Sequence, residues 1–517
     1  MPSTLSQPPA KLNLITPEAN PAPTSLPAPG SAPGPQSAPQ PTLTRSLSLR
    51  GAVTLNLLNM IGVGPFITLP LLIGAMGGPQ AMLGWVLGAL LALCDGLVWA
   101  ELGAALPQAG GTYAYLRAIY PGRLGRTLSF LFLFQVFFSC PLSVASGAIG
   151  LSQYATYLAP SLTGHTLLHQ IHLGPYTAAI SIGPTTAVAI AVVALAVLLL
   201  FRNLSRIGVL STVMLVIVLG SIAWIILTGL LHGHLAQAVH LPPGAFHLSP
   251  AFFAGLASAM LIATYDYWGY YNVSLLGAEV WDPGRTIPRA ILLSIALVAA
   301  LYIAMNLSIL AVLPWQSLLS AQALPARRAM ASVFIETAYT PSLGPATAHL
   351  LAQIAAVLIM VTAFGSVFAL LLGYSRIPFA AAAAGDFFRV FARLHPNRGF
   401  PYVSLLTLAS AAAVFCFFSL ADVIAAMVVL RLLLQFLTQH IGVLYLRRSQ
   451  PGLPRPFRLW LYPLPPLVAL AGFTYILLAR ANFTRELALA AVVILVGLSL
   501  FLLRGMDTGP STRASIS

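Results

Sequence analysis

The sequence predicts an all-α, polytopic membrane protein, and three observations carry that prediction: composition, the length of the apolar segments, and the placement of charge. Of the 517 residues, 58% are hydrophobic and only 7% are charged, which is unlike a soluble globular domain. Apolar runs of about 20 residues, long enough to cross a hydrocarbon core, recur from Gly51 to Leu503. We therefore expect one membrane domain that uses nearly the whole chain.

The two ends of the chain differ from this membrane domain. Residues 1–46 are rich in Pro, Ala and Ser and contain no apolar run. Such a composition cannot bury enough surface to fold, so we expect a disordered cytoplasmic tail with no cleaved signal. The membrane domain is expected over 47–506, with a short cytoplasmic tail at 507–517.

Apolar windows, punctuated by Pro, Gly and charged residues, divide the membrane domain into about 12 transmembrane helices. The expected spans lie near 51–76, 80–106, 127–158, 179–200, 207–231, 251–280, 287–313, 345–375, 401–418, 421–446, 459–479 and 485–503. An even number of spans places both termini on the same side of the membrane.

The basic residues select that side. Twenty of the 25 Lys and Arg residues fall on the side of the termini, four fall opposite, and Arg431 lies inside a span. Because positive residues concentrate in cytoplasmic loops, both termini should be cytoplasmic. No basic stripe or aromatic platform accompanies these residues, so the lipid bilayer is the expected partner and nucleic acid is not.

Cysteine and histidine spacing predicts no disulfide framework, metal site or cofactor. The three cysteines each lie inside an apolar run without paired spacing. His165, His169 and His172 could share one helical face, but no cysteine or carboxylate supports them as metal ligands. Solvated loop histidines are the preferred interpretation.

The first span carries a cluster of helix breakers near its middle. Gly62, Gly64 and Pro65 should interrupt the helix, and the freed peptide groups then need protein, water or a ligand as partners. The start of the second half-helix suits a carboxylate, with Val63, Gly64 and Phe66 as the expected amide donors. The alternative is a proline kink that serves only helix packing.

The sixth span is interrupted in a similar way by polar and aromatic residues at 264–272. Asp266 lies well inside this span, and an ionised carboxylate there costs several kcal/mol unless it is paired or hydrated. It could hold an ammonium group or a proton, or it could be a structural partner of Arg431. Tyr265, beside the break, could cover a bound ligand.

Two interrupted spans five apart predict an inverted-repeat transporter with its site at the bilayer midplane. Ser143 in the third span could face that site, although serine also bonds within its own helix. Glu279 and Arg285, at the cytoplasmic end of the sixth span, indicate either an ion-paired gate or a solvated helix end. Glu101, at the end of the second span, has the same two interpretations.

Several motifs in this order resemble those of the amino acid-polyamine-organocation (APC) permeases, nearest the L-type amino-acid and polyamine-uptake branches. The resemblance covers about residues 50–450. Its motifs are Gly62-Val63-Gly64 followed by Phe66, Ala100-Glu101-Leu102-Gly103 with Ala109-Gly110-Gly111-Thr112-Tyr113, Gly277-Ala278-Glu279-Val280-Trp281-Asp282-Pro283-Gly284-Arg285, and Ser375-Arg376-Ile377-Pro378-Phe379-Ala380.

The resemblance implies a LeuT-like, five-plus-five inverted repeat with broken helices 1 and 6, alternating access, and a small amine-bearing substrate. The repeats would cover about 51–231 and 251–446, followed by two extra helices at about 459–503. By position, Val63 and Gly64 match the amides that take a carboxylate, and Tyr265 matches an aromatic gate. Carbonyl acceptors for the amino group match Ile61, Tyr265, Asp266 and Trp268.

We therefore expect a plasma-membrane amino-acid permease driven by a proton gradient or by exchange. The expected substrate-binding residues are Ile61, Gly62, Val63, Gly64, Phe66, Ser143, Tyr265, Asp266 and Trp268. The expected gating or coupling residues are Tyr265, Asp266, Glu279 and Arg285. The alternatives are a polyamine or organic-cation carrier and a non-transporting sensor or channel, whereas no metal set, nucleophile-base pair or phosphate loop favours an enzyme.

Overall fold

The structure, a computed structural model, describes residues 43–164, 166–173, 176–202, 204–319, 329–418, 428–480 and 482–507. The expected tails at 1–46 and 507–517 lie almost entirely outside these residues, as do His165 and the start of the expected tenth span.

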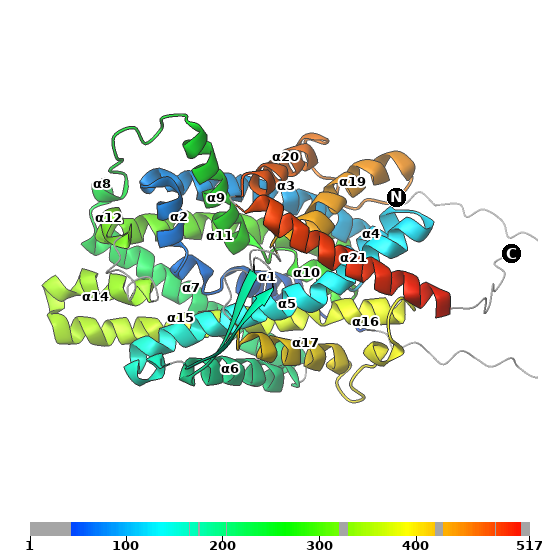
Figure 1. The fold of residues 1–517 in the computed structure, drawn as a ribbon, viewed down its shortest axis with the longest axis horizontal. Helices are drawn as coiled ribbons and strands as arrows, with labels where there is room; N and C mark the ends of the chain where they lie inside the picture. The colour runs from blue at the N-terminus through cyan, green and yellow to red at the C-terminus, as the bar shows by residue number, and fades with distance from the viewer. Residues whose placement is uncertain are drawn as a thin grey trace, which may run out of the picture. The chain divides into compact units, whose positions relative to one another are not determined.

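Long apolar helices make up most of the described chain (Figure 1). Within the described residues, seven helices are long and apolar enough to cross a membrane. These are Pro79–Ala105, Gly122–Leu158, Ile207–His232, Pro283–Val312, Pro345–Ala383, Val428–Ser449 and Phe483–Leu503, and shorter apolar helices lie at Pro184–Leu200, Tyr402–Phe415 and Leu464–Leu478. Helices of this length and hydropathy are those of a multi-pass membrane protein.

Most helices of the described chain have eight residues or more. The longer ones are α1 (Leu49–Met60), α2 (Leu69–Met76), α3 (Met82–Ala105), α4 (Thr112–Ile119), α5 (Gly122–Leu158), α6 (Pro184–Leu200), α7 (Leu204–His232), α9 (Pro250–Tyr267), α11 (Pro283–Val312), α14 (Met330–Leu343), α15 (Pro345–Tyr374), α16 (Arg376–Ala383), α17 (Tyr402–Phe415), α19 (Thr438–Ser449), α20 (Leu464–Leu478) and α21 (Phe483–Asp507). The shorter ones are α8 (Leu235–Ala238), α10 (Asn272–Leu275), α12 (Trp315–Leu319), the 3-10 turns η1 (Gly64–Phe66), η2 (Pro79–Ala81), η3 (Pro160–Thr163), η4 (Gly277–Glu279) and η6 (Arg389–Ala392), and the π-helical η7 (Leu432–Leu437).

The first expected span is interrupted at the glycine and proline cluster. α1 begins after Ser48, whose hydroxyl accepts a hydrogen bond from the Gly51 amide at 3.4 Å, and it ends at Met60. The chain then leaves helical geometry, passes through η1, and resumes as α2. Pro65 lies inside η1, where its missing amide hydrogen breaks the regular ladder of helix hydrogen bonds.

The sixth expected span is interrupted as well, between α9 and α10. Trp268 turns out of the helix with a ψ of 144°, and Gly269 follows with a φ of 126°. A Cβ atom at Gly269 would lie 2.8 Å from the Met60 amide nitrogen and 2.9 Å from the Asn59 carbonyl carbon. Glycine is therefore required there for two reasons, since the backbone is left-handed and the two breaks touch at this residue.

Closely packed helices enclose the two breaks. α3 packs against α9 and α11, and α5 packs against α15 and α21, as Figure 1 also shows for α21 crossing α5. Gly84 of α3 lies against Ala259 of α9, and Gly96 of α3 lies against Ile295 of α11. Small residues at these crossings let the helix backbones approach, as is typical of membrane helices.

A short antiparallel hairpin lies between α5 and α6 in the sequence. Its strands are β1 (Thr166–Leu173) and β2 (Tyr176–Ile182), with an irregularity in β1 before His169. The sequence predicts a loop between spans in this region, and a strand gives His169 and His172 no shared helical face, which was the alternative considered for a metal site. Among the described residues, no group of three or more His, Cys, Asp or Glu is placed to hold a metal ion.

Candidate functional site

A cavity of about 250 Å³ lies where the two broken helices meet. Both breaks, α5, α15 and the residue that precedes η7 contribute to its walls. The lining residues are Asn59, Met60, Gly62, Val63, Gly64, Pro65, Ile67, Thr68, Ser143, Ser146, Gly147, Tyr265, Asp266, Trp268, Gly269, Tyr271, Ser366, Leu370, Tyr374 and Arg431. The volume far exceeds the space that one buried water needs, so a small organic molecule fits.

Most residues expected to bind substrate line this cavity, but two do not. Ile61 and Phe66 are fully buried and lie outside the lining. The Phe66 amide donates to the Val63 carbonyl at 3.1 Å, and the Phe66 carbonyl accepts from the Tyr154 hydroxyl at 3.1 Å. The expectation that Phe66 supplies a free donor is therefore wrong, because its own turn already uses that amide.

The peptide groups freed by the first break divide into two sets. The Met60 carbonyl, at the end of α1, accepts a hydrogen bond from the Tyr302 hydroxyl of α11 at 2.8 Å. Val63 and Gly64 line the cavity, and their amides have no hydrogen-bond partner within the described part of the chain. Unpaired amides at a helix start are donors for an anion or a dipole in the cavity.

Asp266 lies at the end of α9 with only 4% of its surface exposed. Thr68, just before α2, donates its hydroxyl hydrogen to Asp266 Oδ2 at 2.6 Å. Asp266 Oδ1 lies so close to Gly64 that any side chain there would overlap it. No ion pair joins Asp266 to Arg431 among the described residues, which argues against a structural pairing of the two.

Arg431 is a cavity residue that the sequence analysis did not assign to the site. It is 5% exposed, and its Nη2 donates to Ser143 Oγ at 3.3 Å and to the Ser139 carbonyl at 3.5 Å. Its guanidinium carbon lies 5.2 Å from the Trp268 ring centroid and 6.0 Å from that of Tyr374. An arginine inside an otherwise apolar span was the signal that could have identified it.

Aromatic rings form one wall beside this arginine. Trp268 stacks on Phe436 of η7 at 5.0 Å with an angle of 20° between the rings, and Tyr265 lies 5.6 Å from Trp268. The π-helical turn η7 thus packs directly on the second break. Such turns are rare and are frequently found at functional sites.

A fully buried polar cluster lies next to the second break. Tyr270 donates its hydroxyl hydrogen to Asp95 of α3, and His440 Nε2 of α19 lies 3.2 Å from Asp95 Oδ1. His440 Nδ1 lies 2.6 Å from the Phe436 carbonyl, which can only accept, so Nδ1 carries a hydrogen. The cluster ties the segment after Trp268 to two neighbouring helices.

The ion pair at the expected cytoplasmic end of the sixth span involves a different arginine from the expected one. Glu279 forms a buried bidentate pair with Arg376, with distances of 2.8 Å from Nε and 3.1 Å from Nη2. Of the two alternatives at this end, Glu279 lies in an ion pair, but with Arg376, whereas Arg285 is exposed and forms no ion pair with Glu279 in the described part of the chain. The Glu279 carbonyl also accepts from the amides of Ser46 and Leu47, which attaches the start of the described chain to this point.

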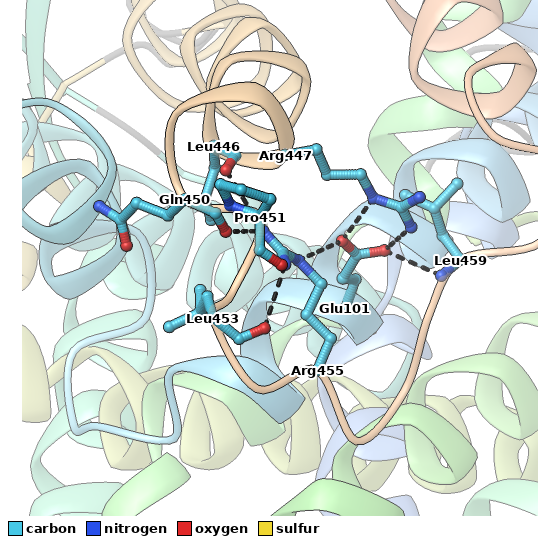
Figure 2. A network of polar contacts seen from close by, with 8 residues as sticks. All are labelled: Glu101, Leu446, Arg447, Gln450, Pro451, Leu453, Arg455 and Leu459. Atoms are coloured by element: carbon cyan, nitrogen blue, oxygen red, sulfur yellow. Dashed lines mark hydrogen bonds and ion pairs between the residues drawn. The ribbon is translucent and has the colours of Figure 1, made fainter.

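Glu101 is not a solvated helix end. Figure 2 shows its carboxylate between Arg447, Arg455 and the Leu459 amide, which donates at 2.9 Å. Arg447 Nε donates to Glu101 Oε1 at 2.9 Å, and Arg455 Nε lies 3.4 Å from the same oxygen. The two other nitrogens of Arg455 donate to backbone carbonyls in the 446–453 segment. Glu101 is 1% exposed, so this network fixes the loop after α19 to the end of α3.

Known proteins resemble this chain over most of its length. The family model described as amino acid permease matches residues 47–502. The Asc-type amino acid transporter 1 of Mus musculus is 28% identical over 472 residues, which covers 89% of this chain and 81% of the relative. The serine/threonine exchanger SteT of Bacillus subtilis is 25% identical over 464 residues, which covers 88% of this chain and 95% of the relative.

A further relative, the cationic amino acid transporter 4 of Homo sapiens, is 24% identical over 367 residues, which covers 71% of this chain and 54% of the relative. The family model takes in both broken helices, the cavity between them and the buried ion pairs at Glu101 and Glu279. The chain therefore belongs to the amino acid permease family of the APC superfamily, and it is a multi-pass membrane transporter rather than an enzyme.

Proposed function

We propose that this chain is a secondary active transporter that moves amino acids across the plasma membrane by alternating access. One observation carries the proposal, which is the cavity in which the free amides of Val63 and Gly64 and the carboxylate of Asp266 face the same space. Peptide donors and a carboxylate are the groups that bind the charged ends of a small zwitterion. The names of the relatives, amino acid transporters and an exchanger, support the same substrate class.

The proposal includes a LeuT-like arrangement of 12 spans with a five-plus-five inverted repeat and both termini in the cytoplasm. The two breaks, α1–α2 and α9–α10, support it because they fall in the first and sixth expected spans. The concentration of basic residues on one side of the expected spans supports the orientation.

The binding mode follows from the positions of the lining groups. Asp266, with the carbonyls near Tyr265 and Trp268, receives the substrate's ammonium group, and Tyr265 closes over it from the cavity wall. The buried pair of Glu279 with Arg376 closes the cytoplasmic end and separates when that end opens. Transport is driven by exchange or by a proton that Asp266 carries, since this buried carboxylate lines the cavity and pairs with no cationic side chain in the described part of the chain.

Counterflow in proteoliposomes tests the function directly. Purified protein is reconstituted, the vesicles are loaded with unlabelled amino acid, and uptake of labelled substrate is measured across a panel of amino acids and amines. A carrier gives saturable uptake that is accelerated by substrate inside the vesicle. Flux that does not saturate would indicate a channel, and no flux of any amino acid would reject the proposal.

A substitution in the first break tests the location of the site. Gly64→Leu should abolish uptake, because its side chain would enter the space occupied by Asp266 and the substrate. Gly220→Leu on α7 is the matched control, since a Cβ atom there meets nothing within 4 Å. Wild-type uptake by an inserted Gly64→Leu protein would contradict this location.

A polyamine or organic-cation carrier is the second candidate, and Asp266 is the observation that favours it. A dication would be attracted to this carboxylate and repelled by Arg431 in the same cavity. Competition by putrescine that exceeds competition by every amino acid would select this candidate.

A further inference from the structure

We propose that Arg431 binds the substrate's carboxylate, opposite Asp266, so that the cavity selects a zwitterionic amino acid by holding both of its charged ends with side chains. The proposal rests on the proposed transport function and identifies the group that recognises the carboxylate. It differs from an arrangement in which the amides of Val63 and Gly64 alone hold that group.

Most hydrogen-bond donors of Arg431 are unused in the described part of the chain. An arginine carries five N–H donors, and only Nη2 of Arg431 has hydrogen-bond partners in the described part of the chain. No carboxylate pairs with it among the described residues, although its side chain is 95% buried and lines the cavity. Burying a guanidinium without an anion is costly, and an anion that enters the cavity removes much of that cost.

Two contacts hold the guanidinium of Arg431 at the cavity. Ser143 of α5 accepts a hydrogen bond from Nη2, and the Trp268 ring lies beneath the guanidinium carbon at 5.2 Å. Neither contact uses Nε or Nη1, so these two nitrogens remain available as hydrogen-bond donors. The π-helical turn η7 begins directly after Arg431, so an irregular turn of this helix lies next to the cavity. A guanidinium held in this way presents the fork of donors that matches a carboxylate.

Asp266 lines the same cavity as Arg431 and carries the opposite charge. Asp266 lies against Gly64 and is fixed by Thr68, so a carboxylate already faces the free amides at the first break. An ammonium group is attracted to Asp266, and the carboxylate of the same substrate is attracted to the guanidinium of Arg431, which adds its charge to the amide donors of the first break. The cavity is therefore lined by a negative group at Asp266 and a positive group at Arg431, and their charges balance those of a neutral amino acid.

The test separates the carboxylate from the rest of the substrate. Counterflow is measured with L-serine against L-serinamide, and with L-alanine against L-alaninamide, or with the same pair made from the amino acid that the panel shows to be transported best. Each amide keeps the amino group and the side chain but lacks the negative charge. The wild type should prefer the acid by about tenfold to a hundredfold, as expected for a charge-assisted hydrogen bond.

Arg431→Gln should weaken transport of the acid and leave the amide nearly unchanged, so that the preference falls close to one. Arg431→Lys should restore part of the preference, since it keeps the charge without the fork. Arg447→Gln is the matched control, because Arg447 lies in the Glu101 network outside the cavity lining, and it should keep the wild-type preference. Should Arg431→Gln fail to insert, Ser143→Ala loosens the same guanidinium and should lower the preference.

An unchanged preference in Arg431→Gln, or in Ser143→Ala where that variant replaces it, would overturn the proposal. Equal loss of acid and amide that Arg431→Lys does not restore would show a purely structural arginine. Loss of L-glutamate transport alone, with the serine preference intact, would assign Arg431 to a side-chain carboxylate and contradict the proposal. Absence of amino-acid counterflow by the wild type would instead reject the proposed function.

Discussion

Replacing Gly269 with alanine acts on the point where the two broken helices touch. Gly269 has a φ of 126°, a conformation that costs other residues about 1–3 kcal/mol. The added Cβ would also lie 2.8 Å from the Met60 nitrogen and 2.9 Å from the Asn59 carbonyl carbon, which are backbone atoms that cannot rotate away. Overpacking of this kind costs about 1–3 kcal/mol, so the total destabilisation should be about 2–6 kcal/mol.

Gly344→Ala is the matched control for this substitution. Gly344 has a φ of 77°, but a Cβ atom there meets nothing within 4 Å, so alanine adds backbone strain without overlap. The assay compares the thermal unfolding of the purified variants and the concentration of amino acid that half-saturates counterflow. Gly269→Ala should be less stable than Gly344→Ala and should bind substrate about tenfold more weakly or worse, since 1.4 kcal/mol corresponds to a factor of ten.

Equal unfolding temperatures of the two alanine variants, together with equal amino-acid concentrations for half-saturation of counterflow, would contradict this prediction. That result would mean that the chain near Gly269 moves away at no cost, and that the contact with Asn59 and Met60 does not shape the cavity.

Three further predictions follow from the same structure. Asp266→Asn should abolish the pH dependence of uptake or change the preference for cationic substrates, and unchanged pH dependence and specificity in vesicles at two pH values would reject its role. Glu279→Gln should destabilise the protein by about 3–5 kcal/mol in thermal unfolding, because it leaves Arg376 buried without its anion, whereas Arg285→Gln on the exposed surface should stay within about 0.5 kcal/mol. Tyr270→Phe removes the hydrogen bond to a buried carboxylate and should cost about 1–3 kcal/mol by the same assay, and a smaller change would argue against that bond.

The helical architecture and the breaks were predictable because they rest on local chemistry. Apolar length defines a membrane helix, and Gly64 with Pro65 makes an uninterrupted helix unfavourable wherever the segment packs. The cavity residues at the breaks were therefore accessible from sequence. Phe66 was assigned wrongly because only the three-dimensional structure reveals that the turn through Val63 already uses its amide.

Pairings between distant residues were not predictable from one sequence. The local spacing of Glu279 and Arg285 allows an ion-paired gate or a solvated helix end, whereas the partner of Glu279 in the structure is Arg376, 97 positions away at the start of α16. Arg431 was visible as a charge inside a span, yet its direction toward the cavity depends on the helix rotation around η7. Periodicity in an apolar helix carries little information about rotation, because all faces have similar hydropathy.

A density map of the protein saturated with a transported amino acid tests directly whether the two broken helices form the substrate site. Both helices should be interrupted, at residues 61–68 and 268–271, and the amino acid should lie between them with its ammonium group toward Asp266. Continuous helices at these positions, or an amino acid bound elsewhere while lipid fills the cavity, would contradict this prediction.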